Sequence, residues 1–271
     1  MSADDISAAH PPPPLLLTMT PSLDVILRAV GYGMVLPATV AMVGLLVGWR
    51  VRGGAKIAIV AGLFAGYVAL AATQQIRWGF LKPVDPSDWL PALTLLAFLA
   101  SVPAEFPSLQ RFVGWPACLG VAVTTGWVLV WAESAIEPVN AWWAVGIAAA
   151  VIVLWRALDH AARHWPGFVM PSLLAVVLLV TAAICEMSGN LTFAHIAGIV
   201  AAVLAGGAVA AGLQPQLPLL RAAVPAVAVM LPGLLFVSFW NNFGEVPSTS
   251  YLLVLAAPVS LSVAVQFTYR D

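Results

Sequence analysis

LTFAHIAGIVAAVLAGGAVAAG, residues Leu191–Gly212, contains one histidine and no Asp, Glu, Lys or Arg. The run is longer than the roughly 20 apolar residues that a helix needs to cross a bilayer. Only helices and closed barrels satisfy all of their backbone hydrogen bonds in hydrocarbon, and this run lacks the alternating pattern of a barrel strand. It therefore predicts a transmembrane helix.

The rest of the chain has the same character. Of its 271 residues, 62% are hydrophobic and 8% are charged, and the mean hydropathy is +0.98, a composition far from that of soluble proteins. We expect an all-α fold, a polytopic transmembrane helical bundle of about nine spans. The predicted spans are Val25–Trp49, Lys56–Ile76, Trp89–Ala104, Gly114–Trp131, Ala141–Leu158, Phe168–Met187, Leu191–Gly212, Leu219–Trp240 and Tyr251–Tyr269.

The third predicted span is the weakest of the nine. Trp89–Ala104 is short, and proline-containing segments flank it on both sides, so a re-entrant segment, which would leave eight spans, is the alternative. Residues 1–24 are acidic and contain four consecutive prolines, which favours a flexible, extended tail. We assign residues 25–271 to a single transmembrane domain.

Basic residues divide unequally between the two ends of the predicted spans. With the N-terminus outside, eight of the 11 fall on the cytoplasmic side, whereas most acidic residues fall outside. The eight are Arg50, Arg52, Lys56, Arg111, Arg156, Arg163, Arg221 and Arg270. The positive-inside rule therefore predicts an N-out, C-in orientation, and we expect an integral protein of a bacterial cytoplasmic (inner) membrane.

Small residues recur at every fourth position in three predicted spans. Such faces let helices approach closely, either within one chain or with a partner protein or a second copy of the chain. Internal packing is the favoured interpretation, and a membrane-protein partner or homo-oligomer is the alternative. The three faces are Gly44 and Gly48; Ala58, Gly62 and Gly66; and Gly198, Ala202, Gly206 and Ala210.

Few motifs indicate chemistry. The middle of every predicted span lacks ionisable residues, which weighs against a proton- or sodium-coupled carrier. His160 and His164 share a helical face, but two ligands are too few for a metal site, and we interpret them as part of a basic helix end. Cys118 and Cys185 are interpreted as packing residues. No nucleotide-binding or hydrolase motif is present; we expect no cofactor, no metal and no nucleic-acid partner.

Polar side chains gather instead at the predicted outer ends of the later spans. Short turns join spans six to nine, so these ends should be neighbours, and amide and carboxylate groups could together bind a polar or cationic group. Ordinary polar loops are the competing interpretation for each residue taken alone. The candidate ligand-binding residues of this outer pocket are Glu186, Asn190, His195, Asn241, Asn242 and Glu245, with Trp240 and Phe243 at the rim and Arg28 as a counter-charge.

Three functional classes follow. The favoured one is a small-solute permease or solute-binding membrane protein that uses the outer pocket. A non-catalytic membrane subunit of a larger complex is the second. The third is an intramembrane enzyme acting on a lipid-linked substrate, for which Glu186–His195 and Glu245–His195 are the acid–base pairs to examine; an enzyme is the less favoured interpretation.

Overall fold

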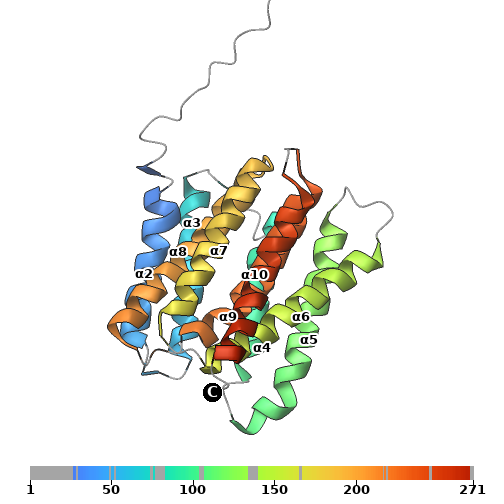
Figure 1. The fold of residues 1–271 in the computed structure, drawn as a ribbon. Coiled ribbons are helices and arrows are strands. Elements are labelled where there is room, and N and C mark those ends of the chain that lie inside the picture. The colour runs from blue at the N-terminus through green and yellow to red at the C-terminus, as the bar shows by residue number, and fades with distance from the viewer. Residues whose placement is uncertain are drawn as a thin grey trace, which may run out of the picture.

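The computed structural model describes residues 27–28, 30–48, 50–51, 53–73, 76, 83–103, 107–133, 140–164, 167–215, 217, 219–243 and 246–268. The helical elements in these ranges are η1 (Gly31–Val35), α2 (Leu36–Gly48), α3 (Gly54–Ala72), α4 (Pro86–Ser101), α5 (Pro107–Ala132), α6 (Ala141–His164), α7 (Val169–Met187), α8 (Leu191–Leu213), α9 (Leu219–Trp240) and α10 (Ser248–Thr268). Strands do not occur in these ranges, so the predicted helical bundle is confirmed (Figure 1). The predicted tail, residues 1–24, lies outside them.

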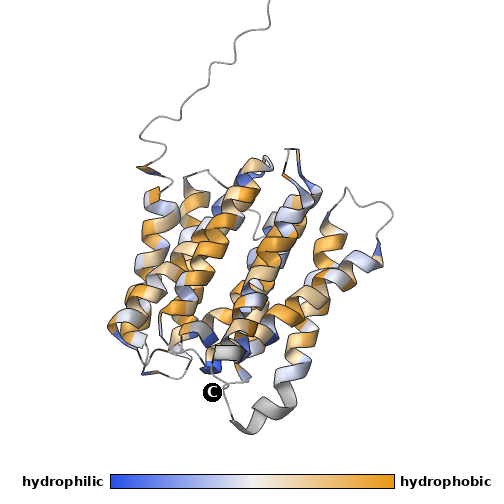
Figure 2. Ribbon diagram, viewed as in Figure 1, coloured by the Kyte–Doolittle hydropathy of each residue, from blue (hydrophilic) through white to orange (hydrophobic). Residues whose placement is uncertain are grey.

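Each predicted span overlaps one helix, but the helices differ in apolar length. Seven are long and apolar enough to cross a membrane, while the apolar parts of α4 and α10, Asp88–Ser101 and Ser248–Ala264, are shorter. The 16 residues of α4 extend about 24 Å, less than the ~30 Å of a hydrocarbon core. Apolar residues cover the helices along their lengths (Figure 2). The chain is a multi-pass membrane protein; a count of nine spans stays a prediction.

The centre of the bundle is α9, with α8 beside it. Every α9 residue from Ala222 to Ser238 is buried, and α9 contacts α4, α6, α7 and α8. Large apolar residues on the outer helices, such as Val47, Ile57 and Leu253, are exposed. This distribution is expected when lipid surrounds the bundle, because the outer helices then bury only the faces that pack on the central helices.

Small residues permit the closest helix contacts. A Cβ atom at Gly206 of α8 would overlap the Ala38 carbonyl oxygen of α2, and one at Gly62 of α3 would lie 2.9 Å from Ala41 Cβ. A Cβ at Gly66 would lie 2.8 Å from Ile199 Cγ2 of α8. Residues of the predicted small-residue faces therefore pack α2, α3 and α8 against one another.

The first span begins with a π-helical turn. Pro37 cannot donate a backbone hydrogen bond, and the preceding Leu36 N–H bonds the Gly31 carbonyl oxygen, five residues back. The wider ring formed by this bond is typical of a π-bulge. Pro37 thus lies two residues after the end of the π-helical turn.

Contacts between helix ends agree with the predicted alternation of direction. At one end, Lys56 near the start of α3 bonds Ser101 at the end of α4. At the other, Glu133 after α5 bonds Asn241 after α9. We call the first the inner end and the second the outer end, following the predicted orientation.

Candidate functional site

The turn between α7 and α8 forms the first part of the outer end. Gly189 has a φ of 84°, a left-handed conformation that favours glycine at a helix C-terminus. The N–H of Gly189 bonds the Glu186 carbonyl at 2.9 Å, and the N–H of Asn190 bonds the Cys185 carbonyl at 2.8 Å. These bonds satisfy the last carbonyls of α7 and place Asn190 at the start of α8.

Hydrogen bonds join this turn to the end of α9. Asn190 Nδ2 donates to the Asn241 carbonyl oxygen at 2.8 Å, and the Phe243 N–H donates to the Ser188 carbonyl oxygen at 3.2 Å. These two hydrogen bonds join the turn between α7 and α8 to the segment after α9, although the two segments are far apart in the sequence.

Glu133 adds a third connection. It directly follows α5 and is 5% exposed, and its Oε2 accepts a 2.7 Å hydrogen bond from Asn241 Nδ2. Because a buried carboxylate requires donors to offset lost hydration, the Asn241 amide is fixed between Glu133 and the carbonyl oxygen of Val237, 3.1 Å away. We define the outer junction as Glu133, Ser188, Asn190, Asn241 and Tyr251.

The remaining members connect the junction to α10. The hydroxyls of Ser188 and Tyr251 lie 2.6 Å apart, and both side chains are buried. Ser188 Oγ also lies 2.7 Å from the Ile184 carbonyl oxygen, and the Tyr251 hydroxyl lies 3.5 Å from the Ser238 carbonyl oxygen. The outer junction therefore holds the ends of α5, α7, α8, α9 and α10 in register.

An aromatic cluster lies against the outer junction. The ring of Trp143 is centred 5.3 Å from that of Trp240 and 5.9 Å from that of Phe236, and Phe239 is 5.6 Å from Tyr251. Trp240 Nε1 is buried and has no hydrogen-bond partner among the residues that the structure describes. Trp240 is thus a packing residue between α6 and α9, whereas Phe243, also predicted at the rim, is 85% exposed.

The predicted outer-pocket residues do not all meet. Asn190 and Asn241 bond directly, but the Asn242 amide bonds the Val246 carbonyl oxygen within its own loop. Glu186 is exposed at the end of α7, and Arg28 is exposed before η1. Glu245 lies outside the described residues.

His195 differs from the other candidates because part of its ring faces the bundle. The side chain is half-buried one turn into α8, and among the described residues its buried Nδ1 has no hydrogen-bond partner. Of the two acid–base pairs considered for an enzyme, Glu186–His195 has no hydrogen bond between described atoms, and Glu245–His195 includes a residue outside the described ranges.

Sequence reasoning left Glu133, Ser188 and Tyr251 out of the outer pocket. The position of Glu133 could have been predicted, because it follows a span that ends on the predicted outer side, the side on which Asn190 also lies. Ser188 and Tyr251 carry no such signal, because single hydroxyl residues near helix ends are common.

A groove between α3 and α4 has different chemistry. It encloses a cavity of about 70 Å³ and is lined mainly by apolar side chains. Its walls include Leu63, Phe64 and Tyr67 of α3 and Pro91, Leu95 and Phe98 of α4. Ile199, Val200 and Met230 of α8 and α9 also line it, and Phe64 and Leu95 are exposed where it opens toward the surrounding lipid.

Lys56 joins the start of α3 to the end of α4 at the inner end of the bundle. Its side chain is 8% exposed, and Nζ donates to the Ser101 carbonyl oxygen at 2.8 Å and lies 2.9 Å from Ser101 Oγ. The ammonium group thus caps the last carbonyls of α4, where a positive charge is favourable. Lys56 and Val60 are one helical turn apart, so the contact joins the groove walls at one end.

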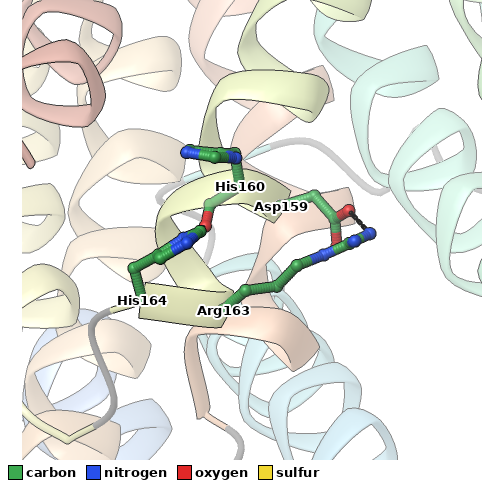
Figure 3. Close-up of polar contacts among 4 residues, drawn as sticks. All are labelled: Asp159, His160, Arg163 and His164. Atoms are coloured by element: carbon green, nitrogen blue, oxygen red, sulfur yellow. Dashed lines mark hydrogen bonds and ion pairs between the residues drawn. The ribbon is translucent and has the colours of Figure 1, made fainter. Parts of the chain in front are cut away.

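The inner end of α6 carries the predicted basic cluster. Arg163 Nη2 bonds Asp159 Oδ2 at 2.7 Å, His164 Nδ1 lies 2.9 Å from the His160 carbonyl oxygen, and the two imidazole rings are centred 4.4 Å apart (Figure 3). Within the described ranges, no three His, Cys, Asp or Glu side chains are grouped to hold a metal.

Comparison of the whole chain with protein-family models, curated proteins and solved structures gives no match.

Proposed function

We propose that this membrane protein binds the apolar chain of a lipid-like molecule, which enters the groove between α3 and α4 sideways from the bilayer. The observation that carries the proposal is the groove itself, an apolar hollow that reaches buried residues of α8 and α9 and opens toward lipid. This is the solute-binding class predicted from the sequence, with an amphipathic ligand in place of a polar one. The charge asymmetry supports a bacterial cytoplasmic membrane as its location.

The size of the cavity favours the apolar segment of a longer molecule over a complete solute. An apolar cavity of about 150 Å³ holds a benzene molecule, so the 70 Å³ found here accommodates a segment of a longer molecule. Aromatic and aliphatic side chains contact such a segment on several sides, which a flat lipid-facing helix surface does not do.

The outer junction provides weaker support for binding a solute. Asn190 and Asn241 already bond each other, and Asn241 bonds a buried carboxylate. A polar ligand there would have to replace these hydrogen bonds, at the cost of separating helix ends that they join.

Native mass spectrometry of the protein extracted in mild detergent tests the proposal. The wild type should retain a lipid-like molecule, and Val60→Trp, which fills the groove from α3, should lose it. Ile57→Trp is the matched control, because Ile57 is on the same helix, exposed and not part of the lining. Helix content and monodispersity of each variant report correct folding.

Equal retention by the Val60→Trp and Ile57→Trp variants would contradict the proposal, as would a wild type that retains no such molecule. If the wild type instead retains a second polypeptide and Val60→Trp releases it, the groove is a subunit interface and the protein belongs to the second functional class.

A further inference from the structure

An exposed arginine lies on the lipid-facing surface between α5 and α6. The Cζ atom of Arg156 is 4.5 Å from the centroid of the Trp115 ring, and Trp115 is 54% exposed. The guanidinium group therefore lies over the indole ring, a cation–π contact that uses none of its five N–H donors on a hydrogen-bond acceptor.

The position of the pair along the helices corresponds to the boundary between hydrocarbon and headgroups. The 24 residues of α6 extend about 36 Å, so several residues at its inner end project beyond a ~30 Å hydrocarbon core. Arg156 is about two turns from that end, where a long arginine side chain reaches the phosphate level. Tryptophan prefers the same depth.

The nearby carboxylate does not neutralise Arg156. Asp159 is on the same helix, but its Oδ2 is bonded to Arg163, and Figure 3 shows these two side chains turned toward each other. Among the residues that the structure describes, the recorded contact of the Arg156 guanidinium is with Trp115. The patch formed by Arg156, Asp159 and Arg163, with two positive charges and one negative, therefore has a net charge of +1.

We propose that Arg156 and Trp115 bind the phosphate group of an anionic phospholipid in the inner leaflet. The guanidinium edge matches phosphate oxygens, and the exposed depth favours a lipid phosphate over a dissolved one. A zwitterionic headgroup brings its own cation to a patch that is already positive, so an anionic lipid is preferred. The proposal uses a surface separate from the α3–α4 groove and does not depend on what that groove binds.

The test compares binding of phosphatidylglycerol and phosphatidylcholine with identical acyl chains to delipidated protein, measured by native mass spectrometry. The wild type should prefer phosphatidylglycerol, and Arg156→Gln should weaken its binding about fivefold, the factor that corresponds to ~1 kcal/mol per arginine at a membrane surface. Arg156→Lys should give an intermediate value, because it keeps the charge and loses the planar donor geometry.

Arg163→Gln is the matched control. It lowers the net charge by the same unit and exposes the Asp159 carboxylate, so a general electrostatic effect would make it at least as damaging as Arg156→Gln. The proposal is overturned if the two variants lose the same affinity, or if Arg156→Gln retains the wild-type preference. Displacement of the lipid by millimolar inorganic phosphate would overturn its assignment to a lipid.

Discussion

Asn241 forms hydrogen bonds through both its side chain and its backbone. Its amide nitrogen donates to Glu133 and Val237, and its carbonyl oxygen accepts from Asn190. Removing a donor from a buried carboxylate costs about 1–3 kcal/mol. We therefore expect Asn241→Ala to lower the free energy of unfolding by roughly that amount, measured by equilibrium unfolding in detergent micelles. Asn241→Asp, which sets a second carboxylate against Glu133, should cost more.

Asn242→Ala is the control for this prediction. The Asn242 amide bonds the Val246 carbonyl oxygen four residues along the chain. Asn242→Ala leaves the Asn241–Glu133 and Asn190–Asn241 hydrogen bonds in place, so it should cost less than Asn241→Ala. The role assigned to the outer junction is contradicted if Asn242→Ala destabilises the protein as much as Asn241→Ala.

Residue identity could predict only part of this arrangement. The short turn between α7 and α8 and the polar loop after α9 placed Asn190 and Asn241 at one end of the bundle, and they do bond each other. The sequence could not show that the bond consumes the groups expected to bind a solute, because hydrogen-bond partners depend on helix rotation and on side-chain directions. The contact between Glu133 and Asn241 could not be predicted either, because it depends on the packing of α5 against α9.

Helix packing is controlled by single glycines, and α5 offers a matched pair. A Cβ atom at Gly126 would overlap the Ala144 carbonyl oxygen of α6, whereas one at Gly120 meets nothing within 4 Å. Gly126→Ala should therefore force α5 and α6 apart and cost about 1–3 kcal/mol. Gly120→Ala should leave stability unchanged or raise it by up to ~1 kcal/mol, because alanine favours helix.

Thermal unfolding of the two α5 variants in the same detergent measures this difference. Equal melting temperatures would mean that α5 and α6 tolerate a wider separation than the structure shows. An increase with Gly120→Ala alone would confirm that the cost at Gly126 comes from the neighbouring helix and not from the helix that carries the glycine.

Helices were predictable as elements because lipid imposes one rule on every span: apolar residues must continue for the thickness of the bilayer. Their ends were less predictable. The structure begins α5 at Pro107, whereas the apolar run begins at Gly114, and α6 continues to His164, past the predicted Leu158. Helices extend beyond the hydrocarbon into polar sequence, such as the segment with Asp159 and Arg163, where hydropathy no longer marks them.

The arrangement of the whole bundle could not be derived from its spans. In the part of the chain that the structure describes, the other helices have exposed residues within their length, whereas α9 is buried from Ala222 to Ser238 and exposed only near its ends. The mean hydropathies of α7 and α9, 2.2 and 2.1, are nearly equal, so hydropathy does not indicate which of the two is central. The α3–α4 groove could not be predicted from single spans either, because residues of four helices, α3, α4, α8 and α9, line it.

The orientation of the whole molecule in the membrane is also a prediction, and it rests on the distribution of basic and acidic residues between the two ends of the spans. Single cysteines can test it because both native thiols, Cys118 and Cys185, are buried and give little background. Phe243→Cys, at an exposed outer position, should react with a membrane-impermeant maleimide in intact cells. Gln214→Cys, after the inner end of α8, should react only after the cells are permeabilised.

The two positions report on opposite ends of the bundle, so each possible result has a distinct meaning. Labelling of Phe243→Cys alone in intact cells places the outer junction outside the cell and the Arg156–Trp115 surface in the inner leaflet, where anionic lipid headgroups are most abundant. The reverse pattern would contradict the N-out orientation and move the Arg156 surface to the opposite leaflet. Labelling of both positions would contradict a single orientation, because one chain cannot expose both ends of α8 and α9 to the same compartment.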